Sequence, residues 1–298
     1  MTRRPLTLVA VALAGACAGS RTGTPVAPVP TPSPYAPATT SAPEPPAAHA
    51  AEAVRYRPSA VRYVVHRRLH IQQALAGDQT QSQDIGAKIF VVAAITGPAD
   101  SVGYPASFAV DSIVADSGAP APIADNMTKV RKLVFMGRVA PRGDFVNVVP
   151  SDSALAQAVV QLLGSFRDFL PRLPSEGLKL GATWTDTVET TQKGSGSEVS
   201  RRAITQATAT EWEDHLGAKS LRVVANQTFR VAGSGKNVGQ PFELSGAGTG
   251  SSVAYVAGDG RYLGGEAQDS TTLTVRLTVQ GVSVPVIQLT HTTVSVLP

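Results

Sequence analysis

The sequence predicts a mainly β domain of the α+β class: an antiparallel curved sheet, in the form of a half-barrel or a sandwich, with one amphipathic helix. Two observations indicate the sheet. Between residues 58 and 298, apolar and polar side chains alternate in many short segments, which is the period of half-buried strands. These segments follow one another through short turns, as in an antiparallel meander. One segment, 153–170, instead has apolar residues at three- and four-residue steps, which predicts the helix.

The part of the domain before the helix, 58–150, is expected to contain five strands. In 61–73 the odd positions are mostly apolar and the even positions include Arg62 and His66, which predicts a strand with one buried face. Residues 89–95 are apolar on both faces, which favours a central place in the sheet. The expected strands are 61–73, 85–95, 108–115, 133–139 and 145–149, with loops at 100–107 and 116–128 and a turn at 140–143.

The predicted helix near 153–170 separates two β-rich parts of the domain. Ser151 or Ser153 offers a hydroxyl for the N-cap, and Pro171 ends the helical pattern. Gly164 interrupts the pattern at a propensity cost of about 1 kcal/mol relative to Ala, so either a close contact or a weak point is expected there.

The part after the helix, 175–298, is predicted to return to β-structure. A polar hairpin tip is expected at 211–218, and Asp259 followed by Gly260 is a strong signal for a tight turn. Pro285 favours an edge position for the last strand. We predict a single domain over 58–298, with two β halves joined by the helix as the alternative. The expected strands are 184–192, 198–210, 221–231, 242–247, 253–256, 271–279 and 284–296.

Residues 1–16 have the layout of a secretory signal peptide. Arg3 and Arg4 form a positive n-region, 6–13 are mostly apolar, and small residues precede Cys17. The apolar run is too short to span a bilayer as a helix. Because Cys17 is the one cysteine of the chain, disulfides, thiolate zinc sites and a cysteine nucleophile elsewhere are excluded.

The segment 13–17, Leu-Ala-Gly-Ala-Cys, resembles the lipobox of bacterial lipoproteins. The resemblance implies that Cys17 is diacylated on its sulfur and becomes the first residue of the mature protein. The alternative is cleavage at the A-x-A sequence of 14–16, which would release a soluble protein with a free thiol. After the anchor, residues 17–57 are rich in Pro, Ala, Thr and Ser, which predicts a disordered, extended spacer.

These segments predict an exported bacterial protein. We expect it to be anchored in the membrane through Cys17, at the outer membrane or on the periplasmic side, with a soluble periplasmic or secreted form as the alternative. Residues 58–298 carry 21 Lys or Arg and 20 Asp or Glu, which excludes the concentrated positive charge that nucleic-acid binding requires. The expected partners are therefore the membrane, a lipid or another envelope protein.

Motifs that carry chemistry are incomplete throughout the chain. His66 and His70 have the spacing of a helical metal pair, but their segment has the period of a strand and Arg68 lies between them, so we expect no metal or other cofactor. The glycine-rich segments 233–237 and 246–250 lack the residues of a phosphate loop and are predicted to be turns. No Gly-x-Ser-x-Gly or Ser-x-x-Lys sequence is present, so we expect no enzymatic activity.

The sequence therefore favours a non-enzymatic cell-envelope lipoprotein with a surface or protein-interaction role. A periplasmic carrier of an apolar ligand, such as a lipid or acyl chain, is the first alternative, and an unrecognised hydrolase is the second. The general plan is similar to that of periplasmic lipoprotein carriers, in which a curved sheet closed by a helix holds acyl chains. This architectural similarity transfers no residue. For the carrier, the ligand is expected between sheet and helix, lined by Val159, Leu162, Phe166 and Phe169.

The lipid anchor can be tested directly. Because the acyl chains would be attached to the sulfur of Cys17, Cys17→Ser should move the protein from the membrane pellet to the soluble periplasmic fraction, measured by immunoblotting after fractionation. Mass spectrometry of the N-terminal peptide provides the control. An unacylated peptide together with an unchanged distribution would contradict the lipoprotein interpretation.

Overall fold

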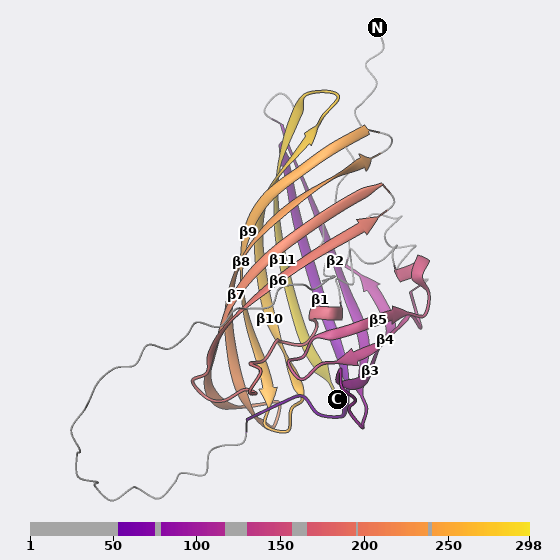
Figure 1. The fold of residues 1–298 in the computed structure, drawn as a ribbon. Helices are drawn as coiled ribbons and strands as arrows, with labels where there is room; N and C mark the ends of the chain where they lie inside the picture. Colours follow the sequence, from indigo (N-terminus) through magenta and orange to yellow (C-terminus); the bar gives the residue numbers. More distant parts are fainter. Residues whose placement is uncertain (1–52, 75–78, 117–129, 157–165, 195, 238–239) are drawn as a thin grey trace, which may run out of the picture.

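The computed structural model describes residues 53–74, 79–116, 130–156, 166–194, 196–237 and 240–298. They form one antiparallel sheet of 11 strands, which curves strongly, so that the mainly β prediction is confirmed (Figure 1). Among the described residues, no helix combines the length and the apolar character needed to cross a membrane. The strands are β1 (Ser59–Ala74), β2 (Thr80–Ile95), β3 (Tyr104–Ala115), β4 (Val134–Val139), β5 (Phe145–Pro150), β6 (Thr183–Gly194), β7 (Ser197–His215), β8 (Ala218–Asn237), β9 (Gln240–Ala257), β10 (Tyr262–Leu277) and β11 (Val282–Leu297).

Two meanders meet through the first and the last strand. The spatial order is β5-β4-β3-β2-β1-β11-β10-β9-β8-β7-β6. β1 and β11 pair from Arg62 opposite Leu297 to Gln73 opposite Val286, so both halves belong to one sheet. The edges are β5 and β6, which follow one another in the chain. Their connection is attached at both margins, because Leu173 N donates to Arg142 O (2.8 Å) and Gly181 N donates to Ala209 O (2.8 Å).

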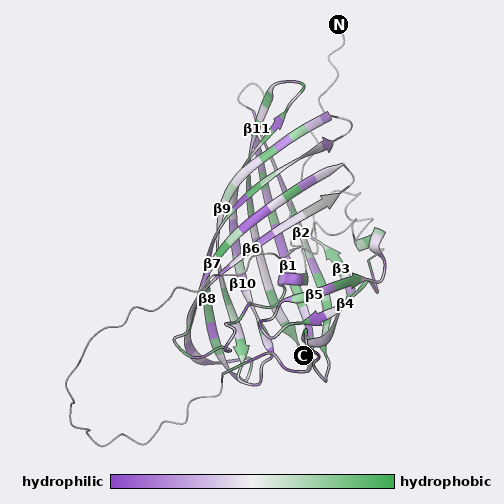
Figure 2. Cartoon of the chain, in the orientation of Figure 1, coloured by the Kyte–Doolittle hydropathy of each residue, from purple (hydrophilic) through white to green (hydrophobic). Residues whose placement is uncertain are grey.

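Alternation along the strands separates an inner from an outer face of the sheet. In β1 most odd residues, such as Tyr63 and Leu69, are buried and the even ones are half-buried or exposed, as the sequence predicts. The register carries this parity across the sheet, and we call the face of Tyr63 the inner face. Apolar and polar residues alternate along most strands in the same way (Figure 2).

The main core lies on the half of the inner face that contains the first half of β1, which we call the basal half. This basal cluster joins β1–β3 to β7–β10 and includes residues of the β5–β6 connection. Phe108 lies at its centre, with its ring centroid 4.7 Å from that of Phe145, 5.5 Å from Phe166 and 5.3 Å from Phe169. Residues before the predicted start of the domain take part, since Val54 pairs with Leu178 and is buried.

The distal half of the inner face holds a second, smaller core. This distal cluster lies farther along the same strands and consists of Leu69, Ile71, Ile85, Val199, Phe242, Leu244, Leu273, Val275, Val284 and Val286. Two apolar clusters on one face require that the sheet curl over them, because a flat sheet would leave the distal residues in water. The inner face is therefore apolar at both ends.

The predicted helix is represented by two short pieces at the ends of its range. Residues 153–156 are helical, and Asp152, rather than Ser151 or Ser153, provides the cap: its Oδ1 accepts a hydrogen bond from Leu155 N at 2.9 Å. The Ser151 hydroxyl instead accepts from Val134 N (3.1 Å). Phe166–Asp168 form a 3₁₀ turn, and the residues between the two pieces, including Gly164, lie outside the described ones.

Both glycine-rich segments lie in strands, so the prediction of turns was wrong. Residues 233–237 belong to β8, and 246–250 continue β9 between the two strands expected at 242–247 and 253–256. The glycines serve side-chain packing, because Gly248 accommodates the ring of Phe229 from β8. This cross-strand contact has no local sequence signal.

Three further differences concern a loop, a hairpin tip and Pro285. The loop expected at 100–107 contributes its last four residues to β3. The expected tip at 211–218 is a two-residue turn at Leu216 and Gly217, both with positive φ, because β7 and β8 pair out to His215. Pro285 lies in an interior strand, so the edge position predicted for this strand was wrong. Because Pro285 is just beyond the last residue pair of β1 with β11, the sheet loses no hydrogen bond to β1 at this proline.

Gly248→Ala tests the contact between β8 and β9. A Cβ at this position would overlap the Phe229 ring and approach Ser270 O to 2.5 Å, so we expect the free energy of unfolding to fall by about 1–3 kcal/mol. Urea denaturation measures the change. Gly258→Ala is the matched control, since its nearest neighbour would be 3.7 Å away and its effect should stay within about 0.5 kcal/mol. Equal losses in the two variants would contradict the assignment.

Candidate functional site

A cavity of about 450 Å³ lies on the inner face between the basal and the distal cluster. Its walls come from β1 and from β6–β11, and the segment 168–172 closes its basal end. Val65 marks the basal side of the cavity wall and Leu273 the distal side. A polar layer lines the middle, and its residues are Arg67, Arg201, Gln227, Asp269, Thr290 and Thr292.

A hydrogen bond across β9 organises the polar layer. Gln227 Nε2 on β8 donates to Asp269 Oδ1 on β10 at 2.7 Å, although β9 lies between the two strands. Gly250, opposite both residues in the register, makes this contact feasible, because a Cβ there would overlap the Asp269 carboxylate. The amide of Gln227 therefore holds the Asp269 carboxylate against the floor of the cavity.

Arg201 extends the polar layer to β7. Its guanidinium lies 4.2 Å from the centroid of the Phe229 ring, and its Nη2 donates to Gln227 Oε1 at 3.4 Å. A guanidinium over an aromatic face is attracted by the ring quadrupole, which orients it without neutralising its charge. Arg201 is therefore held in place by neutral groups.

Arg67 reaches the cavity from the opposite wall. It lies on β1 between Val65 and Leu69, and it occupies an inward position in a series that is otherwise mostly apolar. Burial lowers the pKa of Arg67, and the Asp269 carboxylate partly offsets this effect. Among the described residues, no side chain or carbonyl forms a hydrogen bond or an ion pair with this guanidinium. Its charge is therefore directed at the cavity.

An ionic network forms the basal rim of the cavity. Arg172 lies 3.0 Å from Asp144, 3.1 Å from Asp168 and 3.0 Å from Asp186, and Arg142 lies 3.0 Å from Asp186 as well. Burial lowers the pKa of Arg172, but the three carboxylates outweigh it, so that the pKa lies above its ordinary value. Because the carboxylates come from the β4–β5 turn, the 3₁₀ turn and β6, the network connects both edges of the sheet.

The structure places two of the four predicted lining residues. Phe169 lines the cavity, with its ring centroid 5.1 Å from Tyr63 and 5.9 Å from Tyr262. Phe166 is buried among the rings of the basal cluster instead of lining the cavity, because the chain turns tightly there. Val159 and Leu162, like the lipid attachment residue Cys17, lie outside the described residues.

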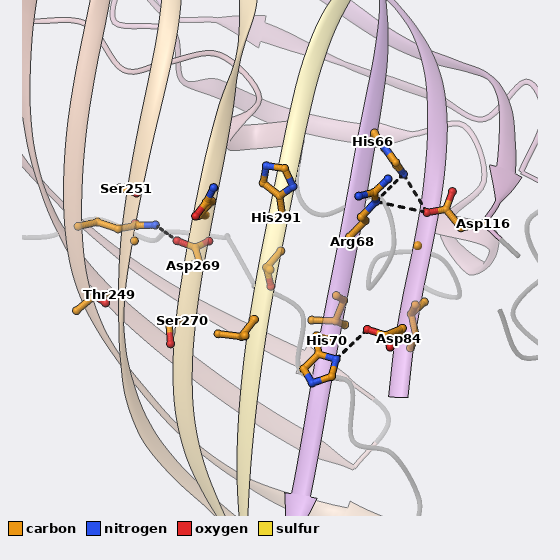
Figure 3. Close-up of a pocket in the computed structure, with 18 of the residues that line it drawn as sticks. His66, Arg68, His70, Asp84, Asp116, Thr249, Ser251, Asp269, Ser270 and His291 are labelled. Carbon is orange, nitrogen blue, oxygen red and sulfur yellow. Dashed lines mark hydrogen bonds and ion pairs between the residues drawn. The ribbon is translucent and has the colours of Figure 1, made fainter. Parts of the chain in front are cut away.

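An open hollow of about 1200 Å³ lies over the strands β1, β2 and β8–β11. His66, Arg68 and His70 follow one another along β1, and His291 on β11 is the register partner of Arg68, as Figure 3 shows. The prediction that both histidines of β1 share one strand face with Arg68 between them is confirmed. These side chains belong to the outer face.

Each histidine of this hollow has a carboxylate of its own. His66 Nε2 lies 2.9 Å from Asp116 Oδ2, and His70 Nδ1 lies 2.8 Å from Asp84 Oδ1. His291 Nε2 lies 2.7 Å from Glu266 Oε1, and this hydrogen bond lowers the pKa of Glu266. Within the part of the chain that the structure describes, no three ligand-type side chains are grouped as a metal site requires. Each of these histidines is therefore paired with a carboxylate.

Sequence reasoning missed the polar layer of the inner cavity. Arg67 had a signal, because it stands at an odd position of the otherwise mostly apolar series in 61–73. Asp269 and Gln227 had none, because their contact depends on the order of three strands and on Gly250.

Comparisons with known proteins identify no family. No protein-family model and no curated protein matches the chain. Among solved structures, Pseudomonas aeruginosa OccK2 (OpdF) matches with a TM-score of 0.28 and 8% identity over 80% of this chain and 98% of its own. Pseudomonas aeruginosa OccK9 (OpdG) matches with a TM-score of 0.27 and 11% identity, over 80% of this chain and 98% of its own. Salmonella typhi OmpF, in complex with daunomycin, matches with a TM-score of 0.25 and 7% identity, over 78% of this chain and 97% of its own. Because these TM-scores are below 0.5, the similarities do not establish the fold or the function of this chain.

Arg172→Ala tests the basal network. The change leaves the partly exposed carboxylates of Asp144 and Asp168 without a cation and Asp186 with Arg142 alone, so we expect the free energy of unfolding to fall by about 2 kcal/mol. Urea denaturation followed by tryptophan fluorescence measures it, since Trp184 Nε1 donates to Arg172 O (3.1 Å). Arg202→Ala, which removes an exposed pair with Glu189, is the control and should change stability by no more than about 0.5 kcal/mol. A loss no greater than the control's would show that the network contributes little.

Proposed function

We propose that the domain is a cell-envelope carrier that binds an apolar ligand in the inner cavity. The observation that carries this proposal is the space of about 450 Å³ left between two apolar clusters on the concave face of the sheet. A partly open cavity of this size, with mainly apolar walls and a few polar groups, is typical of small-molecule sites. A bound apolar ligand would fill this space and remove the apolar surface of the cavity walls from water.

The polarity of the outer face supports a carrier that works in water. The outward positions of β1 include Arg62, Arg68 and His70, and charged residues such as Glu243 and Arg276 occupy the same face on β9 and β10. Charged side chains are costly in hydrocarbon, so this face suits an aqueous compartment. An apolar ligand would then be shielded inside the sheet while the protein itself remains hydrated.

The leader supports a place in the cell envelope. The signal peptide 1–16 directs export, and acylation of Cys17 would tether the domain to a membrane. A tether keeps a carrier close to a lipid source or destination, which raises the local concentration of both. The carrier role and the predicted anchor are therefore consistent.

A protein-interaction role is the second candidate function. It is favoured by the pair Met136 and Val149, which are more than half exposed and face each other on β4 and the edge strand β5. An edge strand with apolar neighbours is a surface to which another chain can add. This role predicts a partner at β5 and requires no ligand in the cavity.

Filling the cavity tests the carrier proposal. The neutral fluorescent probe 1-N-phenylnaphthylamine should bind the full-length protein with saturation and a blue-shifted emission. Ala267→Trp, on the inner face of β10, should weaken this binding at least tenfold, because the indole would occupy the cavity. Ala247→Trp, an exposed position on the outer face of β9, should leave it within twofold. An absence of saturable probe binding by the unmodified protein would reject the carrier and leave the interaction role.

A further inference from the structure

The polar layer of the cavity has an unbalanced charge. In this layer two guanidinium groups, Arg67 and Arg201, accompany one carboxylate, Asp269. Glu266 also borders the cavity, but it occupies an outer-face position of β10 and its carboxylate lies 2.7 Å from His291. The basal rim is a separate network of three carboxylates, Asp144, Asp168 and Asp186, which lie within 3.1 Å of Arg142 or Arg172. The polar layer therefore holds two cations and one anion, and neither of its guanidiniums belongs to the ionic network of the rim.

The two guanidiniums differ from three other arginines of the structure, which are paired with carboxylates. Arg138, Arg172 and Arg261 each lie 3.0 Å or less from a carboxylate oxygen. Arg67 and Arg201 have no such partner among the described residues. Arg201 contacts the Gln227 amide oxygen and the Phe229 ring, and Arg67 interacts with Asp269 electrostatically without a hydrogen bond. Most of their hydrogen-bonding capacity is therefore available to a ligand.

The partial burial of both guanidiniums favours an anion at this position. An arginine cannot discharge itself by losing its proton, so a guanidinium between apolar clusters keeps its desolvation cost until an opposite charge approaches. Asp269 supplies one negative charge for two cations, and its position is restrained by Gln227. One added anion would neutralise the second cation of the polar layer.

We propose that the cavity binds an amphipath with one carboxylate and an unbranched acyl chain, a fatty-acid-type ligand whose head group lies between Arg67 and Arg201. This assignment rests on the proposed carrier function and names its ligand class. The guanidinium forks match a carboxylate geometrically. The acyl chain lies against the apolar walls beyond the polar layer, which include Leu273 and Phe169. A free anion alone would leave those walls uncovered.

Isothermal titration with decanoate, decanol and acetate separates the contributions of head group and chain. For the full-length protein we expect decanoate to bind at least tenfold more tightly than decanol, and acetate to show no saturable binding. Arg67→Gln and Arg201→Gln should each reduce decanoate affinity to near that of decanol while leaving decanol affinity within twofold. Arg67→Lys, which keeps the charge but loses the fork, should retain part of the preference.

Neighbouring arginines on the outer face provide matched controls. Arg68→Gln and Arg202→Gln remove the same charge one residue along the same strands and should leave the tenfold preference intact. Unchanged decanol affinity in the Arg67 and Arg201 variants shows that they fold, and Arg201→Gln decides the matter alone if Arg67→Gln does not fold.

The possible failures can be told apart. Equal affinities for decanoate and decanol, or an equal loss in the outer-face controls, would overturn the carboxylate assignment and leave the carrier proposal standing. Saturable acetate binding as tight as that of decanoate would also overturn it, because the chain would then play no part. If neither decanoate nor decanol nor the neutral naphthylamine probe binds, the carrier function itself is rejected.

Discussion

The pairing of the first strand with the last is the constraint on which the rest of the structure depends. β1 and β11 share a continuous antiparallel register, so two meanders that could each have been a small sheet become one sheet of 11 strands. A sheet of this width with one apolar face must curl to bury that face, because strands twist and water is excluded from apolar surface. The curl creates an inside, and the consecutive strands β5 and β6 become the two margins of its opening.

The connection between these margins covers the basal end of the curved sheet and closes the cavity there. Its aromatic and aliphatic side chains complete the basal cluster, and Arg172 draws carboxylates from three separate elements to one point. Such a network stabilises the arrangement only when all its members are present, because a carboxylate left alone in a partly buried place loses its compensation. Closure of the base and the existence of the cavity above it are therefore linked.

The glycines of β9 determine what can line that cavity. Gly248 and Gly250 leave room on the inner face, so that Phe229 and Gln227 of β8 can extend across β9 towards β10. Through this gap the Phe229 ring supports Arg201, and the Gln227 amide holds Asp269. The same absence of side chains thus permits both the packing of the sheet and the polar layer, which connects stability to the proposed binding of a charged amphipath.

The sequence by itself determined the local features: the strand period in 61–73 and 85–95, the turns at 140–143 and at Gly260, and the antiparallel meander. These depend on neighbours within a few residues, and so they can be recognised from spacing and turn chemistry. Only the tertiary structure decided that Pro285 lies in an interior strand, that 246–250 is strand and not turn, and that Arg67, Arg201, Gln227 and Asp269 meet in one cavity. Those outcomes depend on which strands become neighbours, a choice made by burial of the whole inner face and carried by no single segment.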